Sequence, residues 1–267
     1  PKLVFPGPKM GDAATLVALM NEEGVTMAAG VPTVWTLLLN YLDQSGVKLT
    51  TLKRTLVGGS AVPLSMIRDF EQKHGVLVLQ GWGMTETSPV ATSNRLDRQA
   101  FTGTIGLPIP STETPTRHDN GRDVPMGTAG EICIRGPQVM AGYWQRDDET
   151  AKVMTDDGFF KSGDVGVMDE RGFVRIVDRK KDMILVSGFN VYPNEIEGVV
   201  AMHPGVLECA AVGVPDSKSG EAVKLFVVKK DPALTAADVL KHCREHLTGY
   251  KCPRDVEFRT DLPKTNV

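Results

Sequence analysis

The stretch TLVGGSAVPLSMIRDFEQKHGVLVLQ, which runs from Thr55 to Gln80, decides the fold class. It holds an apolar run at 55–57, a helical pattern from Pro63 to His74, and a second apolar run at 76–79. These patterns predict a strand, a helix and a second strand in succession. A helix that crosses between two strands of one sheet makes those strands parallel. The stretch therefore predicts an α/β fold with a parallel sheet.

The same alternation extends toward the start of the chain. Apolar runs at 3–5 and 25–29 predict strands, and the helical pattern between them begins at Asp12, a residue type that caps helices. Pro32 and Gly46 mark the two ends of a further helix. This first part of the chain is thus predicted to be one layered sheet with helices.

Glycine-rich loops follow both strands of the predicted parallel unit. The first loop is Gly58-Gly59-Ser60-Ala61, and the second is Gly81-Trp82-Gly83-Met84-Thr85-Glu86. Ligands of open parallel sheets bind at the carboxyl ends of the strands. Glycines let a ligand approach the backbone, Trp82 offers a flat face, and Thr85 with Glu86 supply a hydroxyl and a carboxylate suited to phosphate and magnesium. Either loop alone could be an ordinary tight turn, but two on neighbouring strand ends favour a binding site.

The middle of the chain has a different pattern. Helical periodicity disappears between Gly103 and Asp178, and short alternating runs predict strands at 131–135, 164–168 and 173–177. The turn at 169–172 predicts a hairpin between the last two. We therefore predict a β-rich, barrel-like subdomain.

The C-terminal part mixes both kinds of element. Thr235 and Asp238 have the spacing of a capping box and predict a helix start. The other expected elements are strands at 183–186, 206–214 and 223–228 and a helix at 193–202. The predicted organisation is an αβ sheet layer (1–100), the β-rich subdomain (101–179) and a small α+β C-terminal domain (180–267).

Composition limits the class of function. The 30 Lys+Arg against 33 Asp+Glu give a net charge of −3, which argues against nucleic acid as a partner. Four cysteines without a C-x-x-C pair favour a reducing, cytoplasmic setting. The long uncharged run at 25–42 contains Gly, Pro and Asn, so we expect a buried strand and helix there and no transmembrane segment. A peripheral membrane contact and a homodimer both stay open.

Four short motifs occur in an order that resembles the AMP-forming acyl-CoA synthetases, and in particular the fatty-acyl-CoA ligase branch of the adenylate-forming superfamily. The resemblance covers essentially the whole chain. The motifs are Gly81-Trp82-Gly83-Met84-Thr85-Glu86-Thr87, Lys161-Ser162-Gly163-Asp164, the run from Asp178 to Ile184 with Ser187-Gly188-Phe189, and Pro263-Lys264-Thr265.

The resemblance implies the use of ATP, Mg²⁺ and coenzyme A to activate a medium- to long-chain fatty acid. It implies that Glu86 helps to hold Mg²⁺ and that Thr85 contacts the α-phosphate. Trp82, where the family usually has Tyr, would lie against adenine between Gly81, Gly83 and Met84. The loop with Gly59, Ser60 and Ala61 would run along adenine and the acyl chain.

Further roles come from the same resemblance. Asp164 would accept hydrogen bonds from both ribose hydroxyls, a task suited to an acceptor with two oxygens. Arg179 would reach the same nucleotide. Lys181 would be the hinge about which the small domain rotates between the two half-reactions, and the loop with Gly188 would then approach the thiol channel. Taken without their neighbours, Asp164 could be a turn carboxylate and Arg179 and Lys181 part of a solvated charge run.

The resemblance also implies missing parts. The family's phosphate-binding loop has no match here, and its catalytic lysine would lie two residues beyond Val267. We therefore expect residues 1–179 to be the C-terminal part of a large adenylation domain and 180–267 a mobile domain truncated before that lysine. The chain by itself is expected to be inactive.

Two other functions remain open at this level. One is adenylation of a different carboxylic acid, although the neutral run at 28–35 argues against an amino acid. The other is a half-length protein that binds nucleotide or a partner without catalysis. His242 and His246 have a spacing that can bind zinc, but no Glu follows His242 and no third ligand is evident, so no metal site is expected there.

Overall fold

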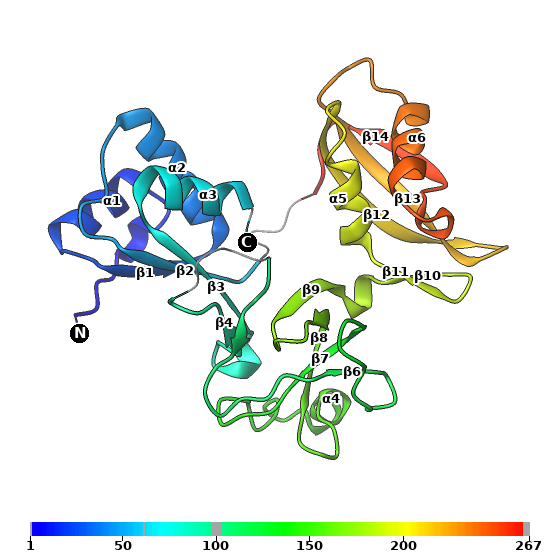
Figure 1. The fold of residues 1–267 in the computed structure, drawn as a ribbon, viewed down its shortest axis with the longest axis horizontal. Helices are drawn as coiled ribbons and strands as arrows, with labels where there is room; N and C mark the ends of the chain where they lie inside the picture. The colour runs from blue at the N-terminus through cyan, green and yellow to red at the C-terminus, as the bar shows by residue number, and fades with distance from the viewer. Residues whose placement is uncertain (1, 61, 63, 98–102, 264–267) are drawn as a thin grey trace.

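The first part of the chain forms a five-stranded sheet in the computed structural model, which describes residues 2–60, 62, 64–97 and 103–263. The sheet order is β1-β2-β3-β4-β5, with β1 to β3 parallel and the last two pairings antiparallel. Figure 1 shows α2 and α3 on one side of β1 to β3. The bounds are β1 Met27–Gly30, β2 Arg54–Val57, β3 Leu77–Trp82, β4 Thr92–Ser93, β5 Leu107–Pro108, α1 Ala13–Glu22, α2 Pro32–Ser45 and α3 Leu64–His74. The predicted parallel unit is confirmed.

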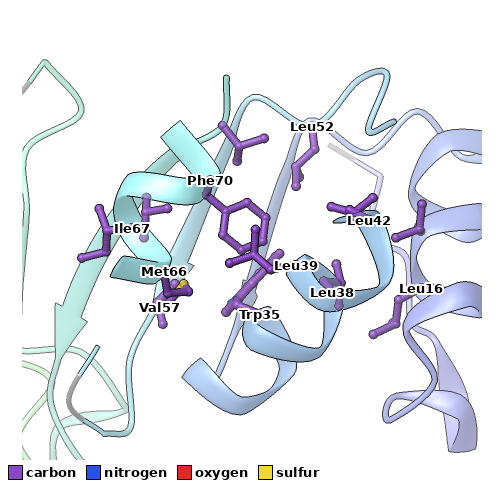
Figure 2. Packing of buried hydrophobic residues seen from close by; sticks show 13 residues of the cluster. Leu16, Trp35, Leu38, Leu39, Leu42, Leu52, Val57, Met66, Ile67 and Phe70 are labelled. Carbon is purple, nitrogen blue, oxygen red and sulfur yellow. The ribbon is translucent and has the colours of Figure 1, made fainter. Parts of the chain in front are cut away.

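Local signals explain where these helices begin and end. Asp12 caps α1 by accepting a hydrogen bond from the Thr15 amide, Pro32 occupies the first turn of α2, and Gly46 ends α2 in the left-handed conformation. The helices then bury an apolar face against the sheet. Trp35 and Phe70 meet edge to face at its centre, with ring centroids 5.6 Å apart, and Figure 2 shows the leucines of α2 around them.

Two expectations for this sheet need correction. The predicted strand at 3–5 is absent: this largely exposed segment has no strand partner among the described residues, and a short 3₁₀ helix, η1 (Gly7–Lys9), follows it. The strand predicted at 76–79 is longer than expected, because β3 continues to Trp82 by pairing with β4. This extension places Gly81 and Trp82 in a strand rather than a loop.

The β-rich part is an antiparallel sheet in the order β6-β7-β8-β9. Its bounds are β6 Thr116–Arg117, β7 Ala129–Ile134, β8 Phe160–Met168 and β9 Val174–Arg179. The hairpin predicted at 169–172 joins β8 to β9. Within the described residues β6 and β9 do not pair, so this sheet is open and the barrel-like expectation is wrong. Four strands, one of them only two residues long, are too few to close.

One helix in this part was not predicted. α4 (Asp147–Val153) has no buried residue and begins with three acidic residues, which stabilise the positive end of a helix. Its lack of an apolar face left no periodic signal in the sequence.

The C-terminal part is α+β, as expected. Its sheet runs β11-β10-β13-β12, with β14 parallel to β13, and α5 and α6 contribute to its core. The capping box of Thr235 and Asp238 begins α6. The bounds are β10 Ile184–Val186, β11 Phe189–Val191, β12 Val206–Asp216, β13 Gly220–Lys229, β14 Asp255–Arg259, α5 Pro193–Val200 and α6 Ala236–His246. In the part of the chain that the structure describes, no helix is both long enough and apolar enough to cross a membrane.

Candidate active site

A cavity of about 860 Å³ lies where β2 and β3 end and where β8 and β9 approach them. Eight of the predicted nucleotide-binding residues line it: Gly59, Ser60, Gly81, Trp82, Gly83, Met84, Asp164 and Arg179. Ala61, also predicted, lies outside the described residues. The fold thus brings together residues from the glycine-rich loops and from the β-rich sheet.

Trp82 and Asp164 form the polar centre of this cavity. The indole Nε1 of Trp82 donates a hydrogen bond of 2.8 Å to Oδ2 of Asp164. Both side chains are almost covered, with exposed fractions of 9% and 7%. On the other side, Nε of Arg179 lies 3.5 Å from Oδ1, because the register of β8 and β9 places Arg179 opposite Asp164. The carboxylate therefore has a fixed orientation and retains lone pairs for hydroxyl donors.

Two glycines, Gly58 and Gly83, let neighbouring backbone segments approach each other closely beside the cavity. A Cβ at Gly83 would lie 2.1 Å from the Pro89 carbonyl oxygen, and a Cβ at Gly58 would lie 2.7 Å from that of Gly81. Atoms at such distances clash, so only glycine fits at either position. The ends of β2 and β3 can then form the floor of the cavity.

Thr85 and Glu86 stand beside this cavity and do not line it. Both belong to η2 (Thr85–Thr87), a single 3₁₀ turn that Gly83 and Met84 separate from the end of β3. Thr85 is exposed, and Glu86 is partly buried. Oε1 of Glu86 accepts a hydrogen bond of 2.9 Å from the hydroxyl of Tyr143, which orients the carboxylate. Burial, followed by this hydrogen bond to Glu86, raises the pKa of Tyr143, so the phenol remains a proton donor.

Lys181 lines a second cavity of about 420 Å³, together with Asp164 and Arg179. It lies in η3 (Lys180–Asp182), the short turn between β9 and β10, and its side chain is exposed. Gly188 lines neither cavity and sits in the β10–β11 turn with φ +82°.

Lys180, next to Lys181, is only partly exposed and is anchored by two carboxylates. Its Nζ lies 2.6 Å from Asp119 and 2.8 Å from Glu131. Burial opposes the charge of Lys180, but the hydrogen bonds that its ammonium group donates to these two carboxylates outweigh this effect and raise the lysine pKa. The charge run is therefore divided into a fixed residue and an exposed one.

Sequence reasoning missed Asp178 and Asn194 in the cavity wall. The carboxylate of Asp178 accepts hydrogen bonds from the main-chain amides of Arg179 at 2.7 Å and Asn194 at 2.9 Å, which ties the end of β9 to α5. Burial raises the pKa of Asp178. Asp178 is the first residue of the charged run 178–182, and this position in the sequence could have indicated that it belongs to the site. No sequence pattern indicated Asn194, because it reaches the cavity wall only through the packing of α5 against the end of β9.

Comparison with known proteins identifies the family. The model of the family described as AMP-binding enzyme matches residues 2–144, more than half of the chain, and that of the AMP-binding enzyme C-terminal domain matches 195–267. The chain belongs to the AMP-binding enzyme family. A long-chain-fatty-acid–CoA ligase of Yersinia pestis is 51% identical to this chain, and the match covers 96% of this chain and 45% of the ligase. A long-chain-fatty-acid–CoA ligase of Bacillus subtilis is 39% identical, and the match covers 97% of this chain and 46% of the ligase. The chain spans about half the length of these AMP-binding relatives.

Solved structures of AMP-binding enzymes share the fold. ATP-bound MatB from Rhodopseudomonas palustris has a TM-score of 0.84 at 36% identity, over 96% of this chain and 50% of that one. o-Succinylbenzoate coenzyme A synthetase from Bacillus subtilis in complex with AMP has a TM-score of 0.81 at 29% identity, over 95% and 51%. Both of these structures contain a bound adenine nucleotide.

Proposed function

We propose that this chain supplies the nucleotide-binding part of an AMP-forming ligase that joins a medium- to long-chain fatty acid to coenzyme A. The observation that carries the proposal is the cavity in which Trp82 and Arg179 flank the buried Asp164 carboxylate. The names of relatives about half identical to this chain support the choice of a fatty acid.

Adenylation makes the acid reactive, because a carboxylate has no good leaving group. In the first half-reaction a carboxylate oxygen attacks the α-phosphorus of ATP and pyrophosphate leaves, which gives acyl-AMP. In the second half-reaction the thiolate of coenzyme A attacks the acyl carbon, and AMP leaves with the electron pair. Both steps need charge neutralised at phosphate oxygens.

The nucleotide would be held by the groups in the cavity. Asp164 would accept hydrogen bonds from the ribose hydroxyls, and Arg179 would serve ribose or phosphate oxygens. The face of Trp82 would lie against adenine, with Gly81, Gly83 and Met84 beside it.

Glu86 fits a role as a Mg²⁺ ligand. Its Oε1 is oriented by Tyr143, and its Oε2 keeps lone pairs that no described protein contact uses. Magnesium in nucleotide sites is typically held by one or two carboxylates together with phosphate oxygens. When bound, the ion would neutralise phosphate charge. The hydroxyl of Thr85 would donate a hydrogen bond to an oxygen of the α-phosphate.

The second half-reaction would use the C-terminal part. We assign Lys181 as the hinge, since it lies exposed in the short turn that joins β9 to β10. Rotation there would bring the loop with Gly188 toward the thiol of coenzyme A. The four cysteines are free thiols, which supports a reducing compartment such as the cytoplasm.

Two alternatives have their own support. Structural neighbours include an anthranilate CoA ligase and an amide bond synthetase, so adenylation of another carboxylic acid is the first alternative. A nucleotide-binding protein without catalysis is the second. A panel of acids separates all three functions, because pyrophosphate release depends on the acid only in an adenylating enzyme.

The test uses the protein produced from the complete open reading frame that contains these residues. We expect pyrophosphate release with fatty acids, and Asp164→Ala should raise the KM for ATP at least about tenfold, since a hydrogen bond to a charged group contributes roughly 1.5–3 kcal/mol. The KM for the acid should stay nearly unchanged. Pyrophosphate release driven by an aromatic or amino acid would support adenylation of another carboxylic acid instead. Unchanged ATP binding in Asp164→Ala would contradict the role of Asp164 in nucleotide binding.

A further inference from the structure

Three potential metal ligands meet on one face of α6. His242, Glu245 and His246 each offer a ligand atom, and these atoms lie within 4.8 Å of one another. The spacing i, i+3, i+4 places them on neighbouring turns of one helix face. The sequence expectation that the histidine pair has no third ligand is therefore wrong, because Glu245 occupies that position.

The hydrogen bonds of the two histidines leave one nitrogen of each ring available. Nε2 of His242 lies 2.9 Å from the Val199 carbonyl oxygen, and Nδ1 of His246 lies 2.9 Å from the His242 carbonyl oxygen. A carbonyl oxygen only accepts, so each of these nitrogens must carry the proton. The opposite nitrogen of each neutral ring then bears a lone pair. Metal-binding histidines are oriented in this way, by donating the second ring N–H to a carbonyl or carboxylate.

The neighbouring groups do not occupy these ligand positions. His203 packs edge to face against His242 with centroids 5.3 Å apart, but its Nδ1 accepts from the Gly205 amide at 3.1 Å. In the neutral ring its Nε2 therefore carries the proton and is no ligand. Nζ of Lys241 lies 4.0 Å from Glu245, an exposed pair of little strength that a metal ion can displace.

We propose that His242, Glu245 and His246 bind a first-row divalent ion of the kind that prefers imidazole, such as Zn²⁺, Ni²⁺ or Cu²⁺. Two nitrogens and one carboxylate oxygen are a common ligand set for such ions. Zinc–ligand bonds of about 2.1 Å bring ligand atoms to roughly 3.5 Å of one another, so atoms that already lie within 4.8 Å need only a small side-chain adjustment to reach a bound ion. Water would complete the coordination.

This site is independent of the proposed nucleotide site. Figure 1 shows α6 in the C-terminal part, away from β8 and β9. All three ligands come from one helix, and His242 also contacts the last turn of α5 through Val199. Metal binding would therefore stabilise α6 and its packing on α5, and it would leave the cavity around Asp164 unchanged.

Calorimetric titration of the tag-free protein with NiCl₂ in a non-chelating buffer tests the proposal. We expect saturable binding of one Ni²⁺ per chain. His246→Gln keeps an exposed polar side chain but removes one ligand, so affinity should fall at least about tenfold. Glu245→Gln should also weaken binding, whereas His118→Gln, which changes an exposed histidine just after β6, should not.

Electron paramagnetic resonance with Cu²⁺ gives an independent readout. The wild-type spectrum should show coupling to two imidazole nitrogens, and the His246→Gln spectrum to one. Circular dichroism establishes that each variant is folded. The proposal is overturned if the wild type shows no saturable Ni²⁺ binding. It is also overturned if the folded His246→Gln and Glu245→Gln variants bind Ni²⁺ as tightly as the wild type.

Discussion

The indole nitrogen of Trp82 donates a hydrogen bond of 2.8 Å to the carboxylate of Asp164, a residue 82 positions later in the chain. This bond joins the end of β3 in the αβ sheet to β8 in the β-rich sheet. It occupies one oxygen of the carboxylate and holds the ring against the cavity wall. The side chain proposed to contact adenine and the one proposed to contact ribose are thereby held as a unit.

The first prediction concerns Trp82→Phe. Phenylalanine keeps an aromatic face but cannot donate to Asp164, so we expect the KM for ATP to rise about 5- to 30-fold, equivalent to roughly 1–2 kcal/mol. The KM for the acid should change little, whereas the melting temperature should fall, because the buried Asp164 carboxylate loses one hydrogen-bond partner. Tryptophan fluorescence should respond to AMP in the wild type and not in this variant. Trp144→Phe is the matched control, since Trp144 is 87% exposed. A change in acid affinity as large as that for ATP would contradict a nucleotide role for Trp82.

A second prediction separates the two half-reactions at Glu86. Glu86→Gln removes the charge while retaining the size, so adenylation should slow by at least about tenfold if the carboxylate helps to hold magnesium. Thioester formation from preformed acyl-AMP should be affected less. Tyr143→Phe keeps the carboxylate and removes only its 2.9 Å hydrogen bond, so its effect should be smaller. Equal losses in both half-reactions of Glu86→Gln would argue against the magnesium role.

The third prediction tests the hinge at Lys181. Proline fixes φ near −65°, so Lys181→Pro should restrict rotation in η3. We expect pyrophosphate release to stay close to wild type, while acyl-CoA formation slows strongly. Lys181→Ala removes the charge without restricting the backbone and should leave both rates nearly unchanged. If the proline variant performs both half-reactions at wild-type rates, the rotation occurs elsewhere.

Cysteine reactivity gives a prediction that needs no substrate. Burial, reinforced by Glu131, raises the pKa of Cys133 to about 11, and burial also raises that of Cys243 to about 11. At pH 8 such thiols are thiolate at roughly one part in a thousand, and both side chains are covered. Cys252, which is only partly buried, should therefore react first with iodoacetamide, and its rate should rise with pH.

Peptide mass spectrometry after labelling at pH 7, 8 and 9 measures this order. All four cysteines should react once the protein is unfolded in guanidinium. Labelling of Cys133 or Cys243 ahead of Cys252 in the folded protein would show that the described packing is wrong at those positions.

The sequence was most informative where structure depends on neighbouring residues. Pro32 and Gly46 bound α2, and Thr235 with Asp238 begins α6, because caps act within one helical turn. It failed at 3–5, where an apolar run pairs with no strand in the part of the chain that the structure describes, and at α4, which lacks an apolar face. Both errors concern segments whose secondary structure depends on tertiary neighbours and not on a periodic pattern in the sequence.

The sequence by itself determined the parallel strand–helix–strand unit, the glycine-rich loops and the motif order that indicates the family, since all of these are local patterns. Only the tertiary structure decided that Trp82 bonds Asp164, that Asp178 ties β9 to α5, and that Tyr143 orients Glu86. These contacts join residues far apart in the chain. They depend on strand register and on the packing of helices against sheets, which no local pattern specifies.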